Sequence, residues 1–527
     1  MNNSSWITIM TLLPLLGAVV TALSGRGQKE GGRGIALTFA LTSTAMALKL
    51  WAGFDLSKTG LQFVEQHPWI PSLGVDYHVG VDGLGITLVL LTAIVLPFAI
   101  ASARGIQRAP SGYFALMLCM QSALYGAFTS LNFFHWFLYW ELSLIPAYFL
   151  VRLWGGPERK NAANTFFVYT MVGSISLLLA MLAGFLVTGT FDFQKLAIAG
   201  QNGDLAQGLA AKLGWIGVFS EGKSLAVFIF CMALLGFAIK VPLFPFHTWL
   251  PEAYTQAPTS TTMVLTGVMS KLGLYGMLRI LLPIFREQAR AMATPLLWLA
   301  LATIVLSTLA ALNRKDIKSM LAYSSINHLG YCLMGIFAMS SASNRQLAEW
   351  AMSGSSSDAK IAGLNAFAAV SNGVIVQMFN HGIIASVLFA LVGFLESRPE
   401  GCPRLDNSGG LRKQAPVLAG VMGMALFASL GLPGLSGFTG EFLIFSGSWG
   451  LASWTTALAT LGLLLSALFH LNIIQKVFSG PLSPAWSRFK DLDLRERLIL
   501  MPALLLILLI GVWPQLLLSA TRLFRAF

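Results

Sequence analysis

Long apolar stretches separated by short polar ones repeat along the whole chain. Fourteen of these stretches are at least about 18 residues long, which is the length that an α-helix needs to cross a bilayer. The pattern therefore predicts an all-α polytopic membrane protein. The expected spans lie near 6–23, 35–54, 84–102, 113–131, 133–154, 164–187, 225–246, 258–283, 294–312, 320–339, 366–395, 415–446, 452–478 and 496–519.

Two of these spans are interrupted by helix-breaking residues. Lys240 ends an apolar run and is followed by Pro242 and Pro245, and a second run contains Pro433 among several glycines. A proline frees backbone groups, which are tolerated at membrane depth only where protein or a water-filled cavity receives them. The breaks lie in the seventh and twelfth spans, so an odd offset inverts one relative to the other. Paired interruptions of this kind indicate an inverted-repeat transporter with its path at the repeat interface.

Composition and charge agree with a membrane protein and argue against a nucleic-acid binder. The chain is 56% hydrophobic and 11% charged, whereas soluble proteins carry about 25% charged residues. The net charge of +12 is spread over the loops, which are numbered here from the loop after the first span. Odd-numbered loops and their edges hold 20 Lys and Arg, and even-numbered loops with the C-terminus hold 10. The positive-inside rule then places the odd loops in the cytoplasm and both termini on the outer face. The four cysteines show no metal-binding or redox spacing, so we expect no metal and no cofactor.

Ionisable residues inside the apolar runs are the candidate functional groups. A charge at the middle of a bilayer costs about 3 kcal/mol or more, so such a residue is by default a functional hypothesis. If Glu141 approached Lys240 to about 7 Å at an effective dielectric of about 20, their attraction of about 2.4 kcal/mol would oppose the cost of burying the lysine charge. We expect a chain of proton-carrying groups, and we assign it to Glu141, Lys240, His247, Lys271, His328, His381 and Glu441.

Each of these residues also has a purely structural interpretation. Glu141 could make a polar contact between helices, and a lone buried histidine is usually a hydrogen-bonded core residue. Two histidines in successive spans together with two lysines and two glutamates favour a relay. We rank His135 and His470 below the relay set. Lys49 and Arg279 lie nearer the ends of their spans, where their charged groups are expected to reach the interface.

With these residues and motifs, the chain resembles a known family, the antiporter-like membrane subunits of respiratory complex I. The resemblance extends in order from about residue 60 to about residue 480, and within the family it is strongest to the chain M or mitochondrial chain 4 group. A glutamate, Glu441, stands where sister subunits usually carry lysine, and the chain ends after the fourteenth span without a long lateral helix. The segments that carry the resemblance are Tyr77-His-Val-Gly-Val-Asp82-Gly, Trp140-Glu141, Lys240-Val-Pro, His247-Thr-Trp-Leu-Pro251, Ala322-Tyr-Ser-Ser-Ile-Asn-His328, Met378-Phe-Asn-His381-Gly and Leu432-Pro-Gly-Leu-Ser-Gly-Phe-Thr-Gly-Glu441.

The resemblance implies fourteen helices with two inverted five-helix repeats: residues 1–112 form helices 1–3, 113–290 the first repeat (helices 4–8), 291–480 the inverted second repeat (helices 9–13) and 481–527 helix 14. It further implies one proton path per subunit, in which Glu141 and Lys240 form the input-side pair. Lys271 then connects the halves with help from His247, His328 and His381, and Glu441 faces the exit. The implied partners are the other membrane subunits of a complex I-type assembly, with sister subunits on both sides and the lateral helix of the distal subunit. The implied location is the bacterial inner membrane or a thylakoid-type membrane.

One departure from the family pattern concerns the seventh span. The family often has Leu-Pro-Asp-Ala-His, whereas this chain has Glu252 and Tyr254 in place of the aspartate and the histidine. A tyrosine hydrogen-bonds but does not readily ionise near neutral pH. Either water bridges that step or the cytoplasmic access is altered.

Three other functions remain open beside a proton-translocating, cofactor-free subunit of a donor:quinone oxidoreductase. One is a subunit of a Mrp-type sodium/proton antiporter, which shares these motifs. The second is a subunit of a ferredoxin-fed, hydrogenase-linked or CO2-hydrating relative of complex I. The third is a structural spacer without a working path, which the set of buried ionisable residues argues against.

Overall fold

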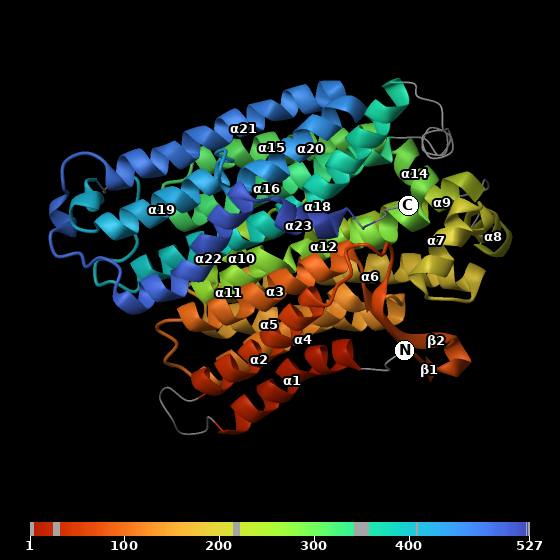
Figure 1. The fold of residues 1–527 in the computed structure, drawn as a ribbon, viewed down its shortest axis with the longest axis horizontal. Coiled ribbons are helices and arrows are strands. Elements are labelled where there is room, and N and C mark those ends of the chain that lie inside the picture. Colours follow the sequence, from red (N-terminus) through yellow and green to blue (C-terminus); the bar gives the residue numbers. More distant parts are fainter. Residues whose placement is uncertain are drawn as a thin grey trace.

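The structure is a computed structural model, and it describes residues 5–24, 32–213, 222–341, 358–406, 409–522 and 524. Within these residues the chain is a bundle of helices that run in roughly one direction through the molecule (Figure 1). A small antiparallel hairpin and two short helices, α7 (Phe193–Gln201) and α8 (Asp204–Leu213), lie at one end of the bundle (Figure 1). The hairpin consists of β1 (Gln62–Ile70), the 3₁₀ turn η1 (Pro71–Leu73) and β2 (Val75–Val81), with Gln62 opposite Val81.

The helices follow the apolar runs of the sequence. Before the first break they are α1 (Trp6–Ser24), α2 (Arg33–Ala52), α3 (Gly83–Ser102), α4 (Pro110–Thr129), α5 (Phe133–Trp154), α6 (Arg159–Thr188), α7 (Phe193–Gln201), α8 (Asp204–Leu213) and α9 (Gly222–Lys240). Between the breaks they are α10 (Trp249–Gln256), α11 (Thr259–Val264), η2 (Leu265–Met269), α12 (Lys271–Gly276), η3 (Met277–Leu281), α13 (Leu282–Ile284), α14 (Arg286–Ala291), α15 (Ala293–Leu312), α16 (Ile317–Ser340), α18 (Asp358–Glu396), the 3₁₀ turn η4 (Leu411–Lys413) and α19 (Pro416–Ser429). After the second break they are α20 (Ser436–Leu451), α21 (Ser453–Ile473), η5 (Ile474–Phe478), the 3₁₀ turn η6 (Pro484–Trp486), α22 (Leu494–Val512) and α23 (Gln515–Thr521).

Both predicted helix interruptions are confirmed. Helix α9 ends at Lys240, and α10 begins only at Trp249, after Pro242 and the cis peptide bond between Phe244 and Pro245. Helix α19 ends at Ser429, and α20 begins at Ser436 after Pro433. A third irregularity was not expected: the span after α10 contains two π-helical turns, η2 and η3, on either side of α12. Single π turns inside helices occur frequently at functional sites.

The loops between the helices gather at the two ends of the bundle. In the contacts given below, each loop pairs with loops at its own end. At one end, Leu131 donates its backbone N–H to the His78 carbonyl, and Asn132 pairs with Asp192. Each of these lies in an even-numbered loop or at its edge. At the other end, Asp316 pairs with Arg404, and the Gly410 N–H donates to the Ser479 carbonyl. This separation is what an alternating up-and-down course of the spans requires.

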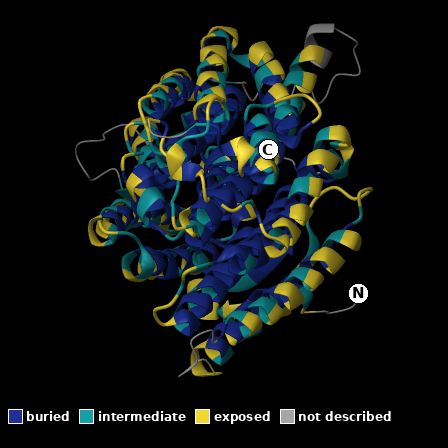
Figure 2. Ribbon diagram, turned by 90° about the vertical axis from the view of Figure 1, so that its left-hand side faces the viewer, coloured by how far each residue is buried: buried dark blue, intermediate teal, exposed yellow. Residues whose placement is uncertain are grey.

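The surface of the bundle is apolar along its helices. Figure 2 shows buried residues in the interior and exposed residues on the outward faces of the outer helices. On α6, the outward positions Val168, Val172, Ile175 and Leu179 are each at least half exposed, and their spacing of three or four residues gives one apolar stripe. Such stripes suit lipid or neighbouring membrane helices, and the chain is an integral membrane protein.

Eight of the described helical stretches are long and apolar enough to cross a membrane, or nine if the bent pair α22 and α23 counts as one span. The remaining expected spans correspond to helices that are broken or carry more polar side chains, namely α4, α5, α9, α16 and α19 with α20. The count of fourteen therefore stays a prediction. So does the placement of both termini on the outer face, since residues 1–4 and 525–527 lie outside the described part.

Arg279, which the sequence places near the end of its span, forms an ion pair with the residue that directly follows β2. Its guanidinium lies 2.5 Å from the carboxylate of Asp82, which also caps the first turn of α3 by accepting the Gly85 N–H. The guanidinium lies over the rings of Tyr275 and Phe524 as well. Lys49 is exposed, and its ammonium lies over the Trp6 ring. That either side chain reaches the membrane interface stays a prediction.

Candidate functional site

The first break places a buried lysine against an aromatic ring. Lys240 is 3% exposed, and its Nζ lies 4.7 Å from the centroid of the Trp140 ring on α5. Trp140 is itself fixed, because its indole N–H donates to the Ser174 hydroxyl at 2.9 Å. Glu141, the next residue along α5, lies within electrostatic range of Lys240. Its Oε1 is buried and has no hydrogen-bond partner in the described part of the chain. This oxygen is therefore free to accept a proton or a hydrogen bond.

A small cavity connects Lys240 with the next element. It measures about 10 Å³ and is lined by Phe166, Lys240, Trp249, Tyr254, Leu265, Met269 and Ser270. That volume is about what one water molecule needs, and the lysine and two hydroxyl groups offer it polar partners. The Tyr254 hydroxyl lies near the hydroxyls of Thr266 and Ser270. The side chain that replaces the expected histidine therefore lies on this connection.

Lys271 lies at the centre of the bundle and contacts three groups. It is 0% exposed, and its Nζ donates to the Thr266 carbonyl at 2.5 Å and lies 3.3 Å from the Ser270 hydroxyl. The Thr266 carbonyl is available because the π turn η2 shifts the backbone pairing immediately before Lys271. The third contact is to His381 Nδ1 on α18, at 2.7 Å. The lysine thus bridges the first break and the long helix α18.

Beyond His381 the polar groups continue to the second break. The His381 and His328 rings have centroids 5.4 Å apart, and His328 Nδ1 lies 3.0 Å from Glu441 Oε1. This last pair has ion-pair distance without hydrogen-bond geometry, and the Glu441 oxygen accepts instead from the Gln377 amide at 3.2 Å. Glu441 is only 5% exposed. Two further cavities of about 10 Å³ each touch both His328 and His381, and one of them also touches Glu441.

His470 also belongs to this cluster, although the sequence ranked it lower. It is 0% exposed on α21, and its Nε2 lies 3.0 Å from the Ser429 hydroxyl. His328 Nε2 approaches the same hydroxyl at 3.0 Å. Ser429 is the last residue of α19, so the break itself supplies the group that joins two histidines. Its sequence position, shortly before Gly431 and Pro433, marks the break but does not reveal that its hydroxyl meets two histidines.

Six of the seven predicted residues therefore follow one another through the interior, in the order Glu141, Lys240, Lys271, His381, His328 and Glu441. His247 does not join them through any contact in the described residues. It is half-buried in the first break, its ring lies 5.6 Å from Phe244, and its Nδ1 is buried without a partner. The line consists of carboxylates, amines, imidazoles and hydroxyls, all of which accept or donate protons.

Comparisons with known proteins find similarity along almost the whole chain. The sequence profile described as "NADH:quinone oxidoreductase/Mrp antiporter, TM" matches residues 130–353 and 359–467. NADH-quinone oxidoreductase subunit M of Rhodobacter capsulatus is 35% identical over 97% of this chain and 93% of its own length. F(420)H(2) dehydrogenase subunit M of Methanosarcina mazei is 33% identical over 96% of this chain and 94% of its own length. A chain of the respiratory complex I from Thermus thermophilus superposes with a TM-score of 0.79 at 27% identity, covering 98% of both chains.

Proposed function

Since the chain belongs to the NADH:quinone oxidoreductase/Mrp antiporter transmembrane family, we propose that its buried line is the proton path of the subunit. The chain is a proton-translocating membrane subunit of a complex I-type oxidoreductase, and it works beside other membrane subunits of that assembly. The observation that carries the proposed path is the succession of buried polar groups from Lys240, through the cavity it shares with Ser270, to Lys271, His381, His328 and Glu441.

The proposed architecture places this path between two halves. Fourteen spans form two inverted five-helix repeats, 113–290 and 291–480, between helices 1–3 in 1–112 and helix 14 in 481–527. The two observed breaks, five spans apart in the predicted numbering, support this arrangement. Lys271 then lies where the repeats meet, since its partner His381 belongs to the second repeat. Both termini face outward, and the odd loops face the cytoplasm of a bacterial or thylakoid-type membrane.

Loading begins at the first break. A proton is held on Lys240 as long as the Glu141 carboxylate stays close, and it leaves when that pair separates or when Glu141 is neutralised. The Trp140 ring under the ammonium supports the charged form, because a ring face attracts a cation. Moving one charge against 100 mV costs about 2.3 kcal/mol, which is comparable to the pair attraction expected at a separation of several ångströms.

The middle section passes the proton sideways within the bundle. The cavity between Lys240 and Ser270 has room for about one water, which would join the lysine to the Ser270 hydroxyl. Lys271 receives the proton there and can transfer it to His381, because its Nζ already points at the imidazole Nδ1. Tyr254 serves in this section as a hydroxyl bridge, and no ionisation of its side chain is required.

Release occurs at the second break. The Glu441 carboxylate lies 3.0 Å from His328, and at an effective dielectric of about 20 a protonated His328 would attract it by about 5–6 kcal/mol before desolvation is counted. A proton on His328 is therefore drawn toward Glu441, which passes it to the outer face. Ser429 adds a branch to His470 that can stabilise the charged His328 intermediate.

A sodium-carrying role fits this line less well. Hard cations such as Na⁺ are bound by several oxygen ligands, whereas the centre of this path is built from amine and imidazole nitrogens. These nitrogens carry protons and, once charged, repel a metal cation. The carried ion is therefore the proton. The electron donor is set by other subunits, as relatives named for NADH and for F(420)H(2) are 35% and 33% identical to this chain.

The decisive experiment compares Lys240→Met and Glu141→Gln in the native complex, using inverted membrane vesicles with a pH-sensitive dye and donor oxidation followed in parallel. Both variants should pump fewer protons per electron while the complex stays assembled on a native gel. Lys49→Met is the matched control, because Lys49 also lies in an apolar run but is exposed over Trp6. A wild-type proton-to-electron ratio in both test variants would overturn the proposal.

A further inference from the structure

An ion pair at the loop-facing end of the bundle has no part in the path described so far. Lys318, in the first turn of α16, and Glu396, the last residue of α18, have Nζ and Oε1 3.3 Å apart. The Lys318 side chain is 9% exposed and the Glu396 side chain 40%. Lys318 Nζ also donates to the Ala257 carbonyl at 2.9 Å, directly before α11. One partner thus reaches water while the other points into the protein.

The two helices that end in this pair also carry the two central histidines. His328 lies ten residues along α16 from Lys318, or about 15 Å at 1.5 Å per residue. His381 precedes Glu396 on α18 by fifteen residues. Both helices therefore run from the odd-numbered-loop end of the bundle to the buried histidines. A proton could move along them only if polar side chains lie in the interval between the ion pair and the histidines.

Hydroxyl groups line that interval. On the stretch from α11 to α12, Thr262, Thr266 and Ser270 are spaced four residues apart, so they share one face. All three are buried. The Thr266 hydroxyl meets the Ser325 hydroxyl of α16 at 2.9 Å, and Ser270 leads to Lys271. Ser325 in turn lines a cavity of about 10 Å³ that touches both His328 and His381.

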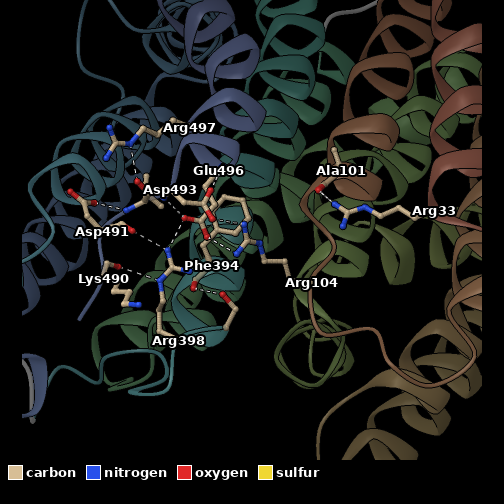
Figure 3. Close-up of polar contacts among 12 residues, drawn as sticks. Arg33, Ala101, Arg104, Phe394, Arg398, Lys490, Asp491, Asp493, Glu496 and Arg497 are labelled. Carbon is tan, nitrogen blue, oxygen red and sulfur yellow. Dashed lines mark hydrogen bonds and ion pairs between the residues drawn. The ribbon is translucent and has the colours of Figure 1, made fainter. Parts of the chain in front are cut away.

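The end of α18 is held in place by a separate set of charges, shown in Figure 3. Arg398, two residues beyond Glu396, donates to the fully buried carboxylate of Glu496 at 2.7 Å and to the carbonyls of Lys490 and Asp491 at 3.2 Å. Arg104 binds the other Glu496 oxygen at 3.2 Å. These contacts fix α18 against α22 and the end of α3. Glu396 can therefore change partner without the helix end moving.

We propose that Lys318 and Glu396 form a second proton entrance, at the odd-numbered-loop end of the bundle, which joins the path at His381 and Lys271; this inference rests on the proton path proposed above. Glu396 takes a proton from water, which removes its negative charge and releases it from Lys318. Lys318 stays on the Ala257 carbonyl, and the proton passes from the Glu396 carboxyl through water held by the hydroxyls of Thr262, Thr266 and Ser325. It reaches the imidazole and amine of His381 and Lys271, and Glu396 returns to the carboxylate that binds Lys318.

The test is Glu396→Gln in the native complex, again in inverted vesicles. The outer surface of such vesicles is the cytoplasmic face, where the odd-numbered loops are expected to lie. The pumping rate at equal donor oxidation should fall on the order of tenfold, less than the 10²–10⁴-fold typical of a lost proton-transfer group, because other loop-side water remains near. Glu396→Asp should restore most of the rate, which a merely structural contact at this exposed position would not require. Lys318→Gln should show the same loss.

A matched control lies on the same surface. Lys315 and Asp406 form an ion pair with the same 3.3 Å separation, but with side chains 65% and 35% exposed. Asp406→Asn should pump like the wild type. Wild-type pumping in Glu396→Gln would overturn the entrance while Lys240→Met still pumps poorly, and normal pumping in Lys240→Met would instead refute the path itself. If Lys318→Gln fails to assemble, Glu396→Gln alone decides, since it leaves Lys318 bonded to Ala257.

Discussion

A glycine in the second break controls where Glu441 lies, and its substitution gives the sharpest test of the release step. Gly431 has φ +78°, and a Cβ added there would lie 2.6 Å from Glu441 Oε2. To reach 3.4 Å, the short end of ordinary contact, the carboxylate oxygen must move by about 0.8 Å. That displacement disturbs the 3.0 Å approach of Glu441 to His328.

The substitution Gly431→Ala has two costs that can be separated. Any L-residue at this φ loses about 1–2 kcal/mol of backbone energy. Gly434, in the same break, has φ +90° and nothing within 4 Å of an added Cβ. Gly434→Ala therefore carries the backbone cost alone, and the difference between the two variants reports the displacement of Glu441.

We expect both variants to lower the melting temperature of the complex to a similar extent, and only Gly431→Ala to lower proton release. A shift approaching 1 Å at a reacting group commonly costs between about tenfold and a hundredfold in rate. The assay is dye quenching in inverted vesicles together with donor oxidation, and native gels check assembly. Equal proton-to-electron ratios for Gly431→Ala and Gly434→Ala would refute the role given to Glu441.

Two further outcomes follow from contacts elsewhere in the chain. Tyr254→Phe should lower pumping several-fold without loss of assembly, because it removes the hydroxyl that lies near Thr266 and Ser270; Tyr254→His should restore pumping, and unchanged pumping in the phenylalanine variant would exclude a hydroxyl bridge. At the hairpin, burial raises the pKa of Asp192, but hydrogen bonds from His78 and two backbone N–H groups outweigh it and hold that pKa below its ordinary value of 3.8. The Asp192 carboxylate thus stabilises the hairpin above pH 4 and loses this effect as the pH falls through its lowered pKa. Limited proteolysis of the hairpin should therefore increase in that acidic range in the wild type. In Asp192→Asn it should already be increased at neutral pH.

Much of the path could be predicted because its members are exceptions to the apolar pattern. Lys240 and Glu441 each stand alone in a long hydrophobic run, and Lys271 shares its run only with Arg279; the cost of burying a charge makes each one conspicuous. The breaks were equally visible, since proline cannot continue a helix.

Other parts depended on how helices meet, which no local pattern records. Ser429 is unremarkable as a serine, yet its hydroxyl lies within 3.0 Å of two histidines from different helices. The Lys318–Glu396 pair joins residues 78 positions apart in the chain, and Arg279 found Asp82 across an even longer interval. His247 carried the same signal as His381, but the turn of the backbone at the first break left it beside Phe244 instead.

The three small cavities along the path have a consequence for the membrane as a whole. Each measures about 10 Å³, which accommodates on the order of one water molecule. A continuous file of solvent would short-circuit the voltage that the assembly builds, at about 2.3 kcal/mol per proton and 100 mV. If the proposed path carries protons, cavities that each hold about one water would interrupt such a file around Lys271, so this conformation would block leakage.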